Sequence, residues 1–468
     1  MTLSNPPAPR PLTRASIFAQ AWPIMLGQAS IPLVGVVDAT VIGRTGDAAA
    51  LAGVALGATV IGLVFWSFGF LRMGMTGLTA QAEGAGDGSE VEALLLRALL
   101  IGGMIGLVLF ALHLPIIWLA FKVLAGGEAV TLEAKAYVQA RFLGAPAALC
   151  VFALNGWLLG LGRTRSALML QVVMNIANIA LDLLFVWGFD MGARGVGLGT
   201  AAAEWIALTT GLVIAGRVAG ASAAGGVPAI LRRTSWNKIV ERAALVRLFA
   251  VNRDIMIRTL ALLFMFTWFA NAGARLGAEA LAANHVLLQF INMAAFVLDA
   301  FAFTAESRVG NAIGSQSRAQ FMRAVRLTGE FSLGAGVGLA ALFFAIGDPV
   351  IAFITTDAEV RATAQKLLPF AALVPLLGMP SWLLDGVFIG ATQGRALRNA
   401  GVLAAIGYIA LDTALRPLDN MGVWMAISAS YLLRAGSLAC YIPALLRTFD
   451  RRSDPSGDPA PAGVPPRV

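Results

Sequence analysis

Long blocks of apolar residues, separated by short polar segments, recur along the whole chain. Three of the clearest are 54–70, 98–121 and 331–346. Each is long enough, or nearly so, to cross about 30 Å of hydrocarbon as an α-helix. Strands of a membrane barrel would be shorter and would alternate strictly between apolar and polar residues. The pattern therefore predicts an all-α membrane protein with about twelve transmembrane helices.

We place the twelve helices at 15–42, 49–79, 93–121, 130–160, 167–189, 195–218, 244–272, 279–309, 323–346, 362–391, 397–416 and 421–446. The residues before the first helix, 1–14, are rich in Pro and carry two Arg, and we interpret them as a cytoplasmic tail. No small-residue cleavage site follows the first apolar block, so this block is expected to remain as the first span. Residues 447–468 turn to Arg, Asp, Ser, Gly and Pro, which predicts a disordered cytoplasmic tail.

Composition agrees with a membrane protein and excludes several other classes. Hydrophobic residues make up 58% of the chain, charged residues 13%, and the mean hydropathy is +0.78. A soluble domain carries roughly 25% charged residues. The net charge is +8, but the basic residues lie between the apolar blocks and form no single patch, so nucleic acid is not expected as a partner.

Cysteine and histidine are too sparse for a disulfide framework or a transition-metal site. Cys150 and Cys440 both lie inside apolar blocks. His113 and His285 are far apart and have no third ligand at metal spacing. No nucleophile elbow or phosphate-binding loop is present either, so no catalytic residue and no organic cofactor are predicted. Energy for any transport is then expected from an ion gradient.

The connections between the blocks differ in charge. Alternate loops, together with the N-terminal tail, hold most of the Arg and Lys, whereas the loops between them hold isolated cations. By the positive-inside rule, this difference predicts that both termini lie in the cytoplasm. An even number of spans requires the same arrangement. The expected location is a bacterial-type inner membrane.

The chain contains two similar halves at a constant offset of 230 residues. The recurring pairs are Ala-Leu-Ala at 50–52 and 280–282, Leu-x-Gly-x-x-x-Gly at 154–160 and 384–390, Ala-Leu-Asp at 180–182 and 410–412, and Met-Gly at 191–192 and 421–422. We infer two pseudo-symmetric six-helix lobes, 15–218 and 244–446, joined by a cytoplasmic linker at 219–243. Repeats of six spans cross the membrane in the same sense, and the cavity between them is the expected substrate path.

Two acids in the first half are candidates for ion binding. Asp38 lies in the first span, downstream of Pro23, and proline bends a helix by removing a hydrogen-bond donor. Charges at membrane depth usually mark ion or substrate pathways. The alternative for Asp38 is a carboxylate near the end of the span that Arg44 neutralises.

A second candidate is a polar stripe on the fifth span. Its members are spaced by four, three and four residues and share one helical face: Gln171, Asn175, Asn178 and Asp182. Amide and carboxylate oxygens suit H⁺ or Na⁺, since hard cations prefer oxygen ligands. The alternative is hydrogen bonding between helices, which polar residues in membrane bundles often provide.

A third stripe runs along the eighth span at steps of seven residues. Its members are His285, Asn292, Asp299 and Glu306. Further charges at or near membrane depth are Arg72, Glu204, Arg253, Asp254, Arg258, Asp385, Asp412 and Arg434. These residues could line a substrate cavity or form a structural ion-pair network. Met73, among aromatic residues, could line an adaptable apolar cavity, or it could pack against protein or lipid.

Six stretches of the sequence resemble the DinF branch of the MATE (multidrug and toxic compound extrusion) family. They are 37–43 (Val-Asp-Ala-Thr-Val-Ile-Gly), 68–81, 180–186 (Ala-Leu-Asp-Leu-Leu-Phe-Val), 273–277, 298–306 and 382–392, and they follow the family order over nearly the whole chain. The resemblance implies the MATE-type fold of twelve helices in two lobes. It also implies an antiporter that exchanges drugs or toxic metabolites for H⁺, or for Na⁺ in some members.

The resemblance also implies a cation site in the N-terminal lobe. The matching positions are Asp38, Tyr137, Asn155, Asn178, Asp182 and Thr200, and Pro23 matches the proline at the bend of the first helix. Other branches place a cation site on acids of the C-terminal lobe. Here Trp268 occupies the position that the 230-residue offset aligns with Asp38, so we expect coupling in the N-terminal lobe.

We therefore predict a secondary active antiporter that exports cationic or amphipathic small molecules by alternating access. Its expected partners are these substrates and membrane lipid, with no obligatory protein partner. A flippase for a lipid-linked precursor is the nearest alternative, since related two-lobed folds do that work. A membrane-embedded enzyme or a channel are alternatives of other classes.

Overall fold

The computed structural model describes residues 12–124, 127–220 and 226–450. Nearly all of these residues are helical, and no strand occurs among them. The first bundle consists of α1 (Arg14–Gly43), α2 (Ala48–Trp66), α3 (Phe70–Gly84), α4 (Gly88–Ala111), α5 (His113–Val123), α6 (Glu128–Phe142), α7 (Ala145–Gly160), α8 (Thr164–Asp182), a π-helical turn η1 (Leu183–Gly188) and α9 (Gly192–Val218).

Two short helices, α10 (Val227–Arg233) and α11 (Trp236–Ile239), lead into the second bundle. This bundle consists of α12 (Arg242–Arg275), α13 (Ala278–Gly314), α14 (Arg318–Ile354), α15 (Ala358–Gly390), α16 (Gly394–Ala414), a 3-10 turn η3 (Arg416–Leu418) and α17 (Asp419–Ala439), followed by α18 (Ile442–Asp450).

Each of the twelve predicted spans coincides with one or two helices, which confirms the predicted fold class. In the described part of the chain, ten helical segments are long and apolar enough to cross a membrane, or eleven when α6 and α7 count as one bent span. α16 is not among them, because Arg395, Arg398 and Asp412 lower its hydropathy. It nevertheless packs along α12 and α17 inside the second bundle.

Four of the predicted spans each contain a break that was not predicted from the sequence, so that each consists of two helices. The breaks fall between α2 and α3, α4 and α5, α6 and α7, and α17 and α18. α6 and α7 meet at 56°, at Gly144 and directly before Pro146 in the first turn of α7. Proline has no N–H to donate and favours the first turn of a new helix, so the chain can change direction there.

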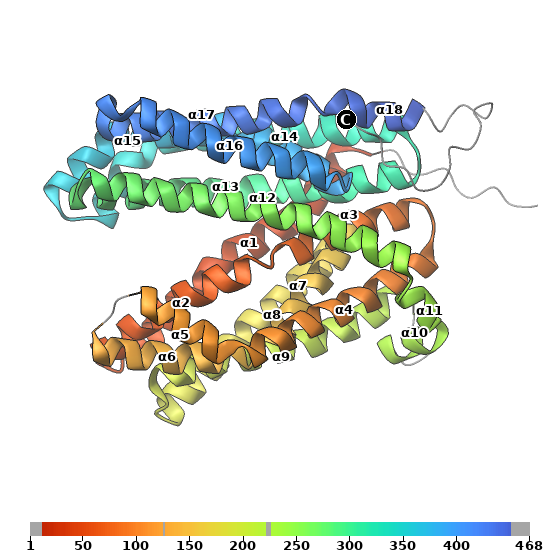
Figure 1. Cartoon of the computed structure of the whole chain (residues 1–468), viewed down its shortest axis with the longest axis horizontal. Helices are drawn as coiled ribbons and strands as arrows, with labels where there is room; N and C mark the ends of the chain where they lie inside the picture. Colours follow the sequence, from red (N-terminus) through yellow and green to blue (C-terminus); the bar gives the residue numbers. More distant parts are fainter. Residues whose placement is uncertain (1–11, 125–126, 221–225, 451–468) are drawn as a thin grey trace, which may run out of the picture.

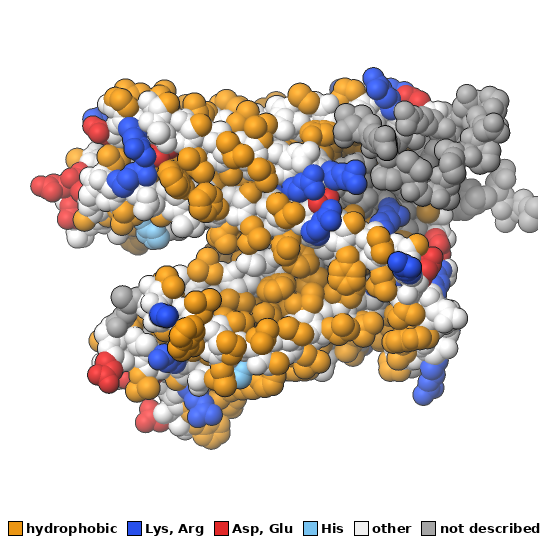
Figure 2. Space-filling model, viewed as in Figure 1, with side chains coloured by type: hydrophobic (Ala, Val, Ile, Leu, Met, Phe, Trp, Pro, Cys, Tyr) orange, Lys and Arg blue, Asp and Glu red, His pale blue; other side chains and the backbone are white. Residues whose placement is uncertain are grey.

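The two bundles form a V (Figure 1). They converge at the end of the molecule where the C-terminal helix lies and diverge toward the opposite end. The space-filling view shows the surface hollowed between the bundles at that open end (Figure 2). At the converging end, α1 packs on α13, and α3 packs on α12, α13 and α15.

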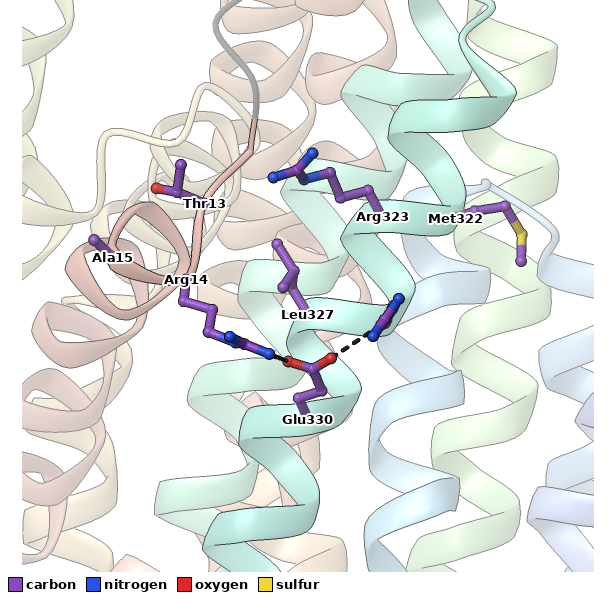
Figure 3. Close-up of a pocket in the computed structure, with 8 residues that line it drawn as sticks. Thr13, Arg14, Ala15, Met322, Arg323, Leu327 and Glu330 are labelled. Atoms are coloured by element: carbon purple, nitrogen blue, oxygen red, sulfur yellow. Dashed lines mark hydrogen bonds and ion pairs between the residues drawn. The ribbon is translucent and has the colours of Figure 1, made fainter.

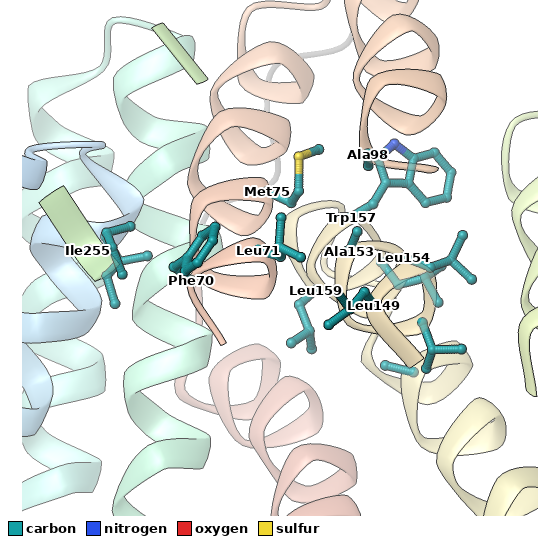
Figure 4. Close-up of a cluster of buried hydrophobic side chains, with 14 of the residues drawn as sticks. Phe70, Leu71, Met75, Ala98, Leu149, Ala153, Leu154, Trp157, Leu159 and Ile255 are labelled. Atoms are coloured by element: carbon teal, nitrogen blue, oxygen red, sulfur yellow. The ribbon is translucent and has the colours of Figure 1, made fainter. Parts of the chain in front are cut away.

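α3 carries much of the contact between the bundles. On one side, Leu71 and Met75 face Leu154 and Trp157 of α7 (Figure 4). On the other side, Phe70 points toward α12. The Trp157 ring is fully buried, and its indole N–H donates to the Val91 carbonyl of α4 at 2.9 Å, so the polar atom of this large side chain is satisfied.

The internal repeat reappears as identical helix packing. A Cβ atom placed on Gly156 of α7 would lie 2.3 Å from the carbonyl oxygen of Arg72 on α3. A Cβ on Gly386 of α15 would lie 2.3 Å from the carbonyl oxygen of Ala302 on α13. Both glycines and both partners are 230 residues apart. Only glycine permits this close approach, so the repeated Gly-x-x-x-Gly motif sets the same helix–helix contact in both bundles.

Candidate functional site

The carboxyl groups of Asp38 and Asp182 meet inside the first bundle. Asp38 comes from α1 and Asp182 is the last residue of α8, and their side chains are within hydrogen-bonding reach of each other. The two residues are 8% and 0% exposed. One oxygen of Asp38 and both oxygens of Asp182 have no hydrogen-bond donor. Two ionised carboxylates offer only acceptors to each other and repel, so a proton held between them would be favoured.

Local backbone features position Asp182. α8 passes into the π-helical turn η1 directly after this residue. π-helical turns are rare and occur frequently at functional sites. A Cβ on Gly199 of α9 would lie 2.1 Å from the Asp182 Oδ1 atom, so the carboxyl group packs directly on the α9 backbone.

Three of the other predicted residues border this carboxyl pair. The Asn178 amide donates to the Thr200 hydroxyl at 3.0 Å, while the Asn178 side-chain oxygen has no donor. Asn178 also contacts Asp182, and the ring of Tyr137, 4% exposed, lies within electrostatic range of Asp38. Asn178, Thr200 and Tyr137 therefore lie near the acids. That these residues belong to one site with them is what the family resemblance implied.

Four of the remaining predicted N-lobe residues line a separate small cavity of about 40 Å³ where the bundles meet. Its walls include Pro23 of α1, Asn155 of α7, Gln171 of α8 and Arg72 of α3. The Asn155 side-chain oxygen has no donor, and Gln171 donates to Asn175 at 2.8 Å. α1 runs through Pro23 without interruption from residue 14 to 43. Since proline lacks an N–H, the helix lacks one internal hydrogen bond beside this cavity.

A buried ion pair lies beside the carboxyl pair. Glu204, one of the charges named above at membrane depth, is one partner, and Arg141, which was not singled out from the sequence, is the other. Arg141 of α6 donates to Glu204 of α9 at 2.9 Å, and the side chains are 7% and 9% exposed. The Arg141 guanidinium also acts electrostatically on Asp38 and Asp182. No ion pair joins Arg44 to Asp38 in the described part of the chain. The positive charge that acts on both acids is therefore that of Arg141.

The four residues of the stripe on α13 differ in how deeply they are buried. Glu306, 1% exposed, pairs with Arg72 of the first bundle at 3.2 Å, and Asp299 lies in the same electrostatic network. His285 and Asn292 are exposed. The steps of seven residues keep all four on one helical face. The outer two are exposed because the bundles diverge toward that end (Figure 1).

Two further acids named above in the second bundle, Asp385 and Asp254, are paired with arginine. Asp385 contacts Arg258, and it lies 3.5 Å from Arg434. Asp254 pairs with Arg398 at 3.1 Å. These contacts favour the structural ion-pair interpretation for this bundle. Met73 is half-buried against the core, with its sulfur 4.0 Å from Arg258, which favours packing over an open cavity wall.

The second bundle contains a counterpart of the carboxyl pair with different chemistry. By the 230-residue offset, Asp412 corresponds to Asp182, and Trp268 corresponds to Asp38. The Trp268 indole N–H donates to Asp412 at 2.9 Å, and Arg275 donates to the same oxygen at 2.8 Å. Asp412 is thus neutralised by the protein itself, whereas the carboxyl pair in the first bundle has no such donors.

Comparisons with known proteins agree with this architecture. The MatE family model matches residues 23–184 and 255–430. DNA damage-inducible protein F of Escherichia coli is 36% identical over 429 residues, which cover 91% of each chain. Multidrug resistance protein PmpM of Pseudomonas aeruginosa is 29% identical, over 94% of this chain and 93% of that protein.

Solved structures share the fold at low sequence identity. A crystal structure of MATE in the bent conformation superposes with a TM-score of 0.84 at 17% identity and covers 94% of this chain and 96% of the other. An outward-facing multidrug resistance MATE family transporter of the MOP superfamily superposes with a TM-score of 0.83, also at 17% identity. The match covers 94% of this chain and 97% of the other.

Proposed function

We propose that this chain, which belongs to the MatE family of multi-pass membrane transporters and is not an enzyme, exports cationic or amphipathic small molecules in exchange for H⁺. The names of its relatives support drugs or toxic metabolites as the cargo. The distribution of Arg and Lys supports an inner-membrane location with both termini in the cytoplasm. The exposed apolar residues at the open end of the V suit an amphipathic substrate.

The observation that carries the proposal is the difference between the two bundles. Asp412 receives hydrogen bonds from an indole and a guanidinium, and so it needs no external cation. Asp38 and Asp182 lack donors, and the Arg141 charge beside them is shared with Glu204. One proton placed between the two carboxyl groups would supply the missing donor. We therefore assign coupling to the first bundle.

The mechanism follows from competition between the proton and the substrate. When Asp38 and Asp182 are deprotonated, their negative charge attracts a cationic substrate into the gap between the bundles. Protonation removes that charge, and the substrate leaves through the open end. The lobes then rock about the converging end, and proton release on the other side resets the pair. Such coupling requires that each ligand bind one state better than the other.

Na⁺ is the second candidate for the coupling ion. The Asn178 side-chain oxygen beside the carboxyl pair has no donor, and amide and carboxylate oxygens are ligands that hard cations prefer. Against Na⁺ stands Arg141, since a fixed positive charge beside the carboxyl pair repels a second cation that retains its charge. A proton instead neutralises a carboxylate. This argument favours H⁺.

Dye export from proteoliposomes tests the proposal and separates the alternatives. Purified protein is reconstituted with a cationic dye inside, and a pH gradient or a Na⁺ gradient is imposed in parallel. We expect saturable export under the pH gradient alone. Export under the Na⁺ gradient alone would identify Na⁺ as the coupling ion. Ion flux without counter-transport would indicate a channel, and transfer of labelled lipid-linked precursor without dye export would indicate a flippase.

A further inference from the structure

An open groove of about 910 Å³ lies between the two bundles at the end where the bundles converge. The start of α1 forms one wall, with Thr13, Arg14 and Ala15. The first turns of α14 form the other wall, with Met322, Arg323, Arg326, Leu327 and Glu330. Figure 3 shows Arg14 and Arg323 directed toward the space between the two helices, with Glu330 below them.

The groove carries an excess of positive charge. Arg14 pairs with Glu330 at 2.9 Å, and Arg326 pairs with the other oxygen of Glu330 at 3.0 Å. Arg323 is exposed and has no ion pair in the described part of the chain. The groove thus holds three guanidinium groups and one carboxylate, which leaves two positive charges in excess. Such a cluster is suited to a phosphate, which accepts hydrogen bonds from several guanidinium groups at once.

The cluster lies at the level where the membrane begins. Residues 331–347 of α14 contain no charged side chain, and Glu330 is the last charged residue before them. A stretch of this length crosses most of the hydrocarbon core. Arg14 is likewise the last charged residue before the apolar part of α1. The groove is therefore at the depth of the lipid head groups.

Exposed apolar side chains continue from the groove into the hydrocarbon region. Phe18, one turn beyond Arg14 on α1, is 50% exposed, and its ring lies 6.2 Å from that of Phe331. On α14, Leu333 and Val337 are 48% and 51% exposed. Lipid acyl chains can contact these side chains while the head group remains at the arginines. A basic cluster directly above an apolar surface is the arrangement that binds anionic lipids between transmembrane helices.

We propose that this groove binds the phosphate of one anionic phospholipid in the leaflet on the side of the chain termini. Arg323 and Arg326 hold the phosphate, and Arg14 contributes from the other bundle. The lipid therefore bridges α1, which carries Asp38, and α14 of the opposite bundle. Glu330 competes with the phosphate for Arg14 and Arg326. A soluble anion has the same charge but no acyl chains to contact Phe18, Leu333 and Val337.

Native mass spectrometry of the purified protein in detergent tests the site, with phosphatidylglycerol or phosphatidylcholine added in parallel. We expect one phosphatidylglycerol to bind at least about 10-fold more tightly than phosphatidylcholine. Both lipids carry a phosphate, but the quaternary ammonium of phosphatidylcholine is repelled by the excess positive charge of the groove, whereas phosphatidylglycerol has a net negative charge. Arg323→Gln and Arg326→Gln, both at exposed positions, should each remove this preference. Arg44→Gln, an exposed arginine at the other end of α1, is the matched control and should retain it.

Glu330→Gln separates a lipid site from a structural ion pair. This variant breaks the pairing of Glu330 with Arg14 and Arg326 but frees both arginines, so phosphatidylglycerol should bind as tightly as before or more tightly. Inorganic phosphate at millimolar concentration should not displace the lipid. The proposal is overturned if the wild type binds the two lipids equally, or if inorganic phosphate displaces the lipid. It is also overturned if Arg44→Gln loses the preference for phosphatidylglycerol, or if Arg323→Gln and Arg326→Gln both retain it.

Discussion

Replacing Arg141 by Met removes the cation that pairs with Glu204 and acts on Asp38 and Asp182. Glu204 is then a buried carboxylate without a partner, 9% exposed, and its second oxygen already has no donor. Removing one partner of a buried ion pair costs about 3–5 kcal/mol. The Arg141 guanidinium also lies 5.3 Å from the Phe65 ring, and loss of this contact adds about 0.5–1 kcal/mol.

Glu204→Gln should cost much less, although it breaks the same ion pair. The buried group contains three carboxyl groups and one guanidinium: Asp38, Asp182, Glu204 and Arg141. Arg141→Met leaves three carboxyl groups without a cation. Glu204→Gln instead leaves two carboxyl groups beside one guanidinium group. The amide oxygen can still accept from Arg141, so we expect a cost of about 1–2 kcal/mol.

A denaturant titration of the purified protein in detergent measures the free energy of unfolding of both variants. Tryptophan fluorescence reports the unfolding. The double variant Arg141→Met/Glu204→Met is the control, since two apolar side chains of similar length leave no unpaired charge. We expect the double variant to be more stable than Arg141→Met alone. The reasoning is refuted if Glu204→Gln destabilises as much as Arg141→Met, or if the double variant loses the sum of the two single costs.

Three further predictions concern the rest of the fold. Gly386→Ala should destabilise by about 1–3 kcal/mol, because the new Cβ meets the backbone of α13, and Gly334→Ala, where nothing lies within 4 Å, should be neutral in the same titration. Asp412→Asn should lower stability, since it weakens a 2.8 Å ion pair with Arg275, yet proton-driven export should persist. Asp87 caps α4 outside the membrane, and hydrogen bonds from the Ser89 hydroxyl and the Glu90 N–H lower its pKa below 3.8. Asp87→Ala should therefore cost about 1 kcal/mol at neutral pH. This difference is fully present above about pH 4, the ordinary pKa of an unfolded Asp, and is lost as the pH falls further through the lowered pKa of the folded protein, where the wild-type carboxylate becomes protonated.

The spans and the repeat could be predicted from the sequence because both depend on local or periodic patterns. Apolar blocks give helix positions, and the Gly-x-x-x-Gly motif predicts the close packing that Gly156 and Gly386 show. The helix breaks were less evident, since apolar residues continue across them. Gly144 and Pro146, at the bend between α6 and α7, are nevertheless a sequence signal for a break.

The site was predictable where its residues share one helix face, and less so where partners come from distant segments. Asn178 and Asp182 lie on one face of α8, so their proximity follows from spacing alone. Arg141 lies in the polar first half of a bent span, and its partner Glu204 is on another helix. Tertiary packing alone brings these two together. For the same reason, periodicity places Asn292 and Glu306 on one face of α13 but does not reveal that only Glu306 is buried.

The central claim is that the carboxyl pair of Asp38 and Asp182, and not Asp412, binds the coupling proton. Initial rates of dye export from proteoliposomes under an imposed pH gradient test it most directly, with Asp38→Asn, Asp182→Asn and Asp412→Asn reconstituted at equal amounts of folded protein. We predict that the first two variants lose gradient-driven export and that Asp412→Asn retains it. Normal export by Asp38→Asn, or loss of export in Asp412→Asn alone, would contradict the account.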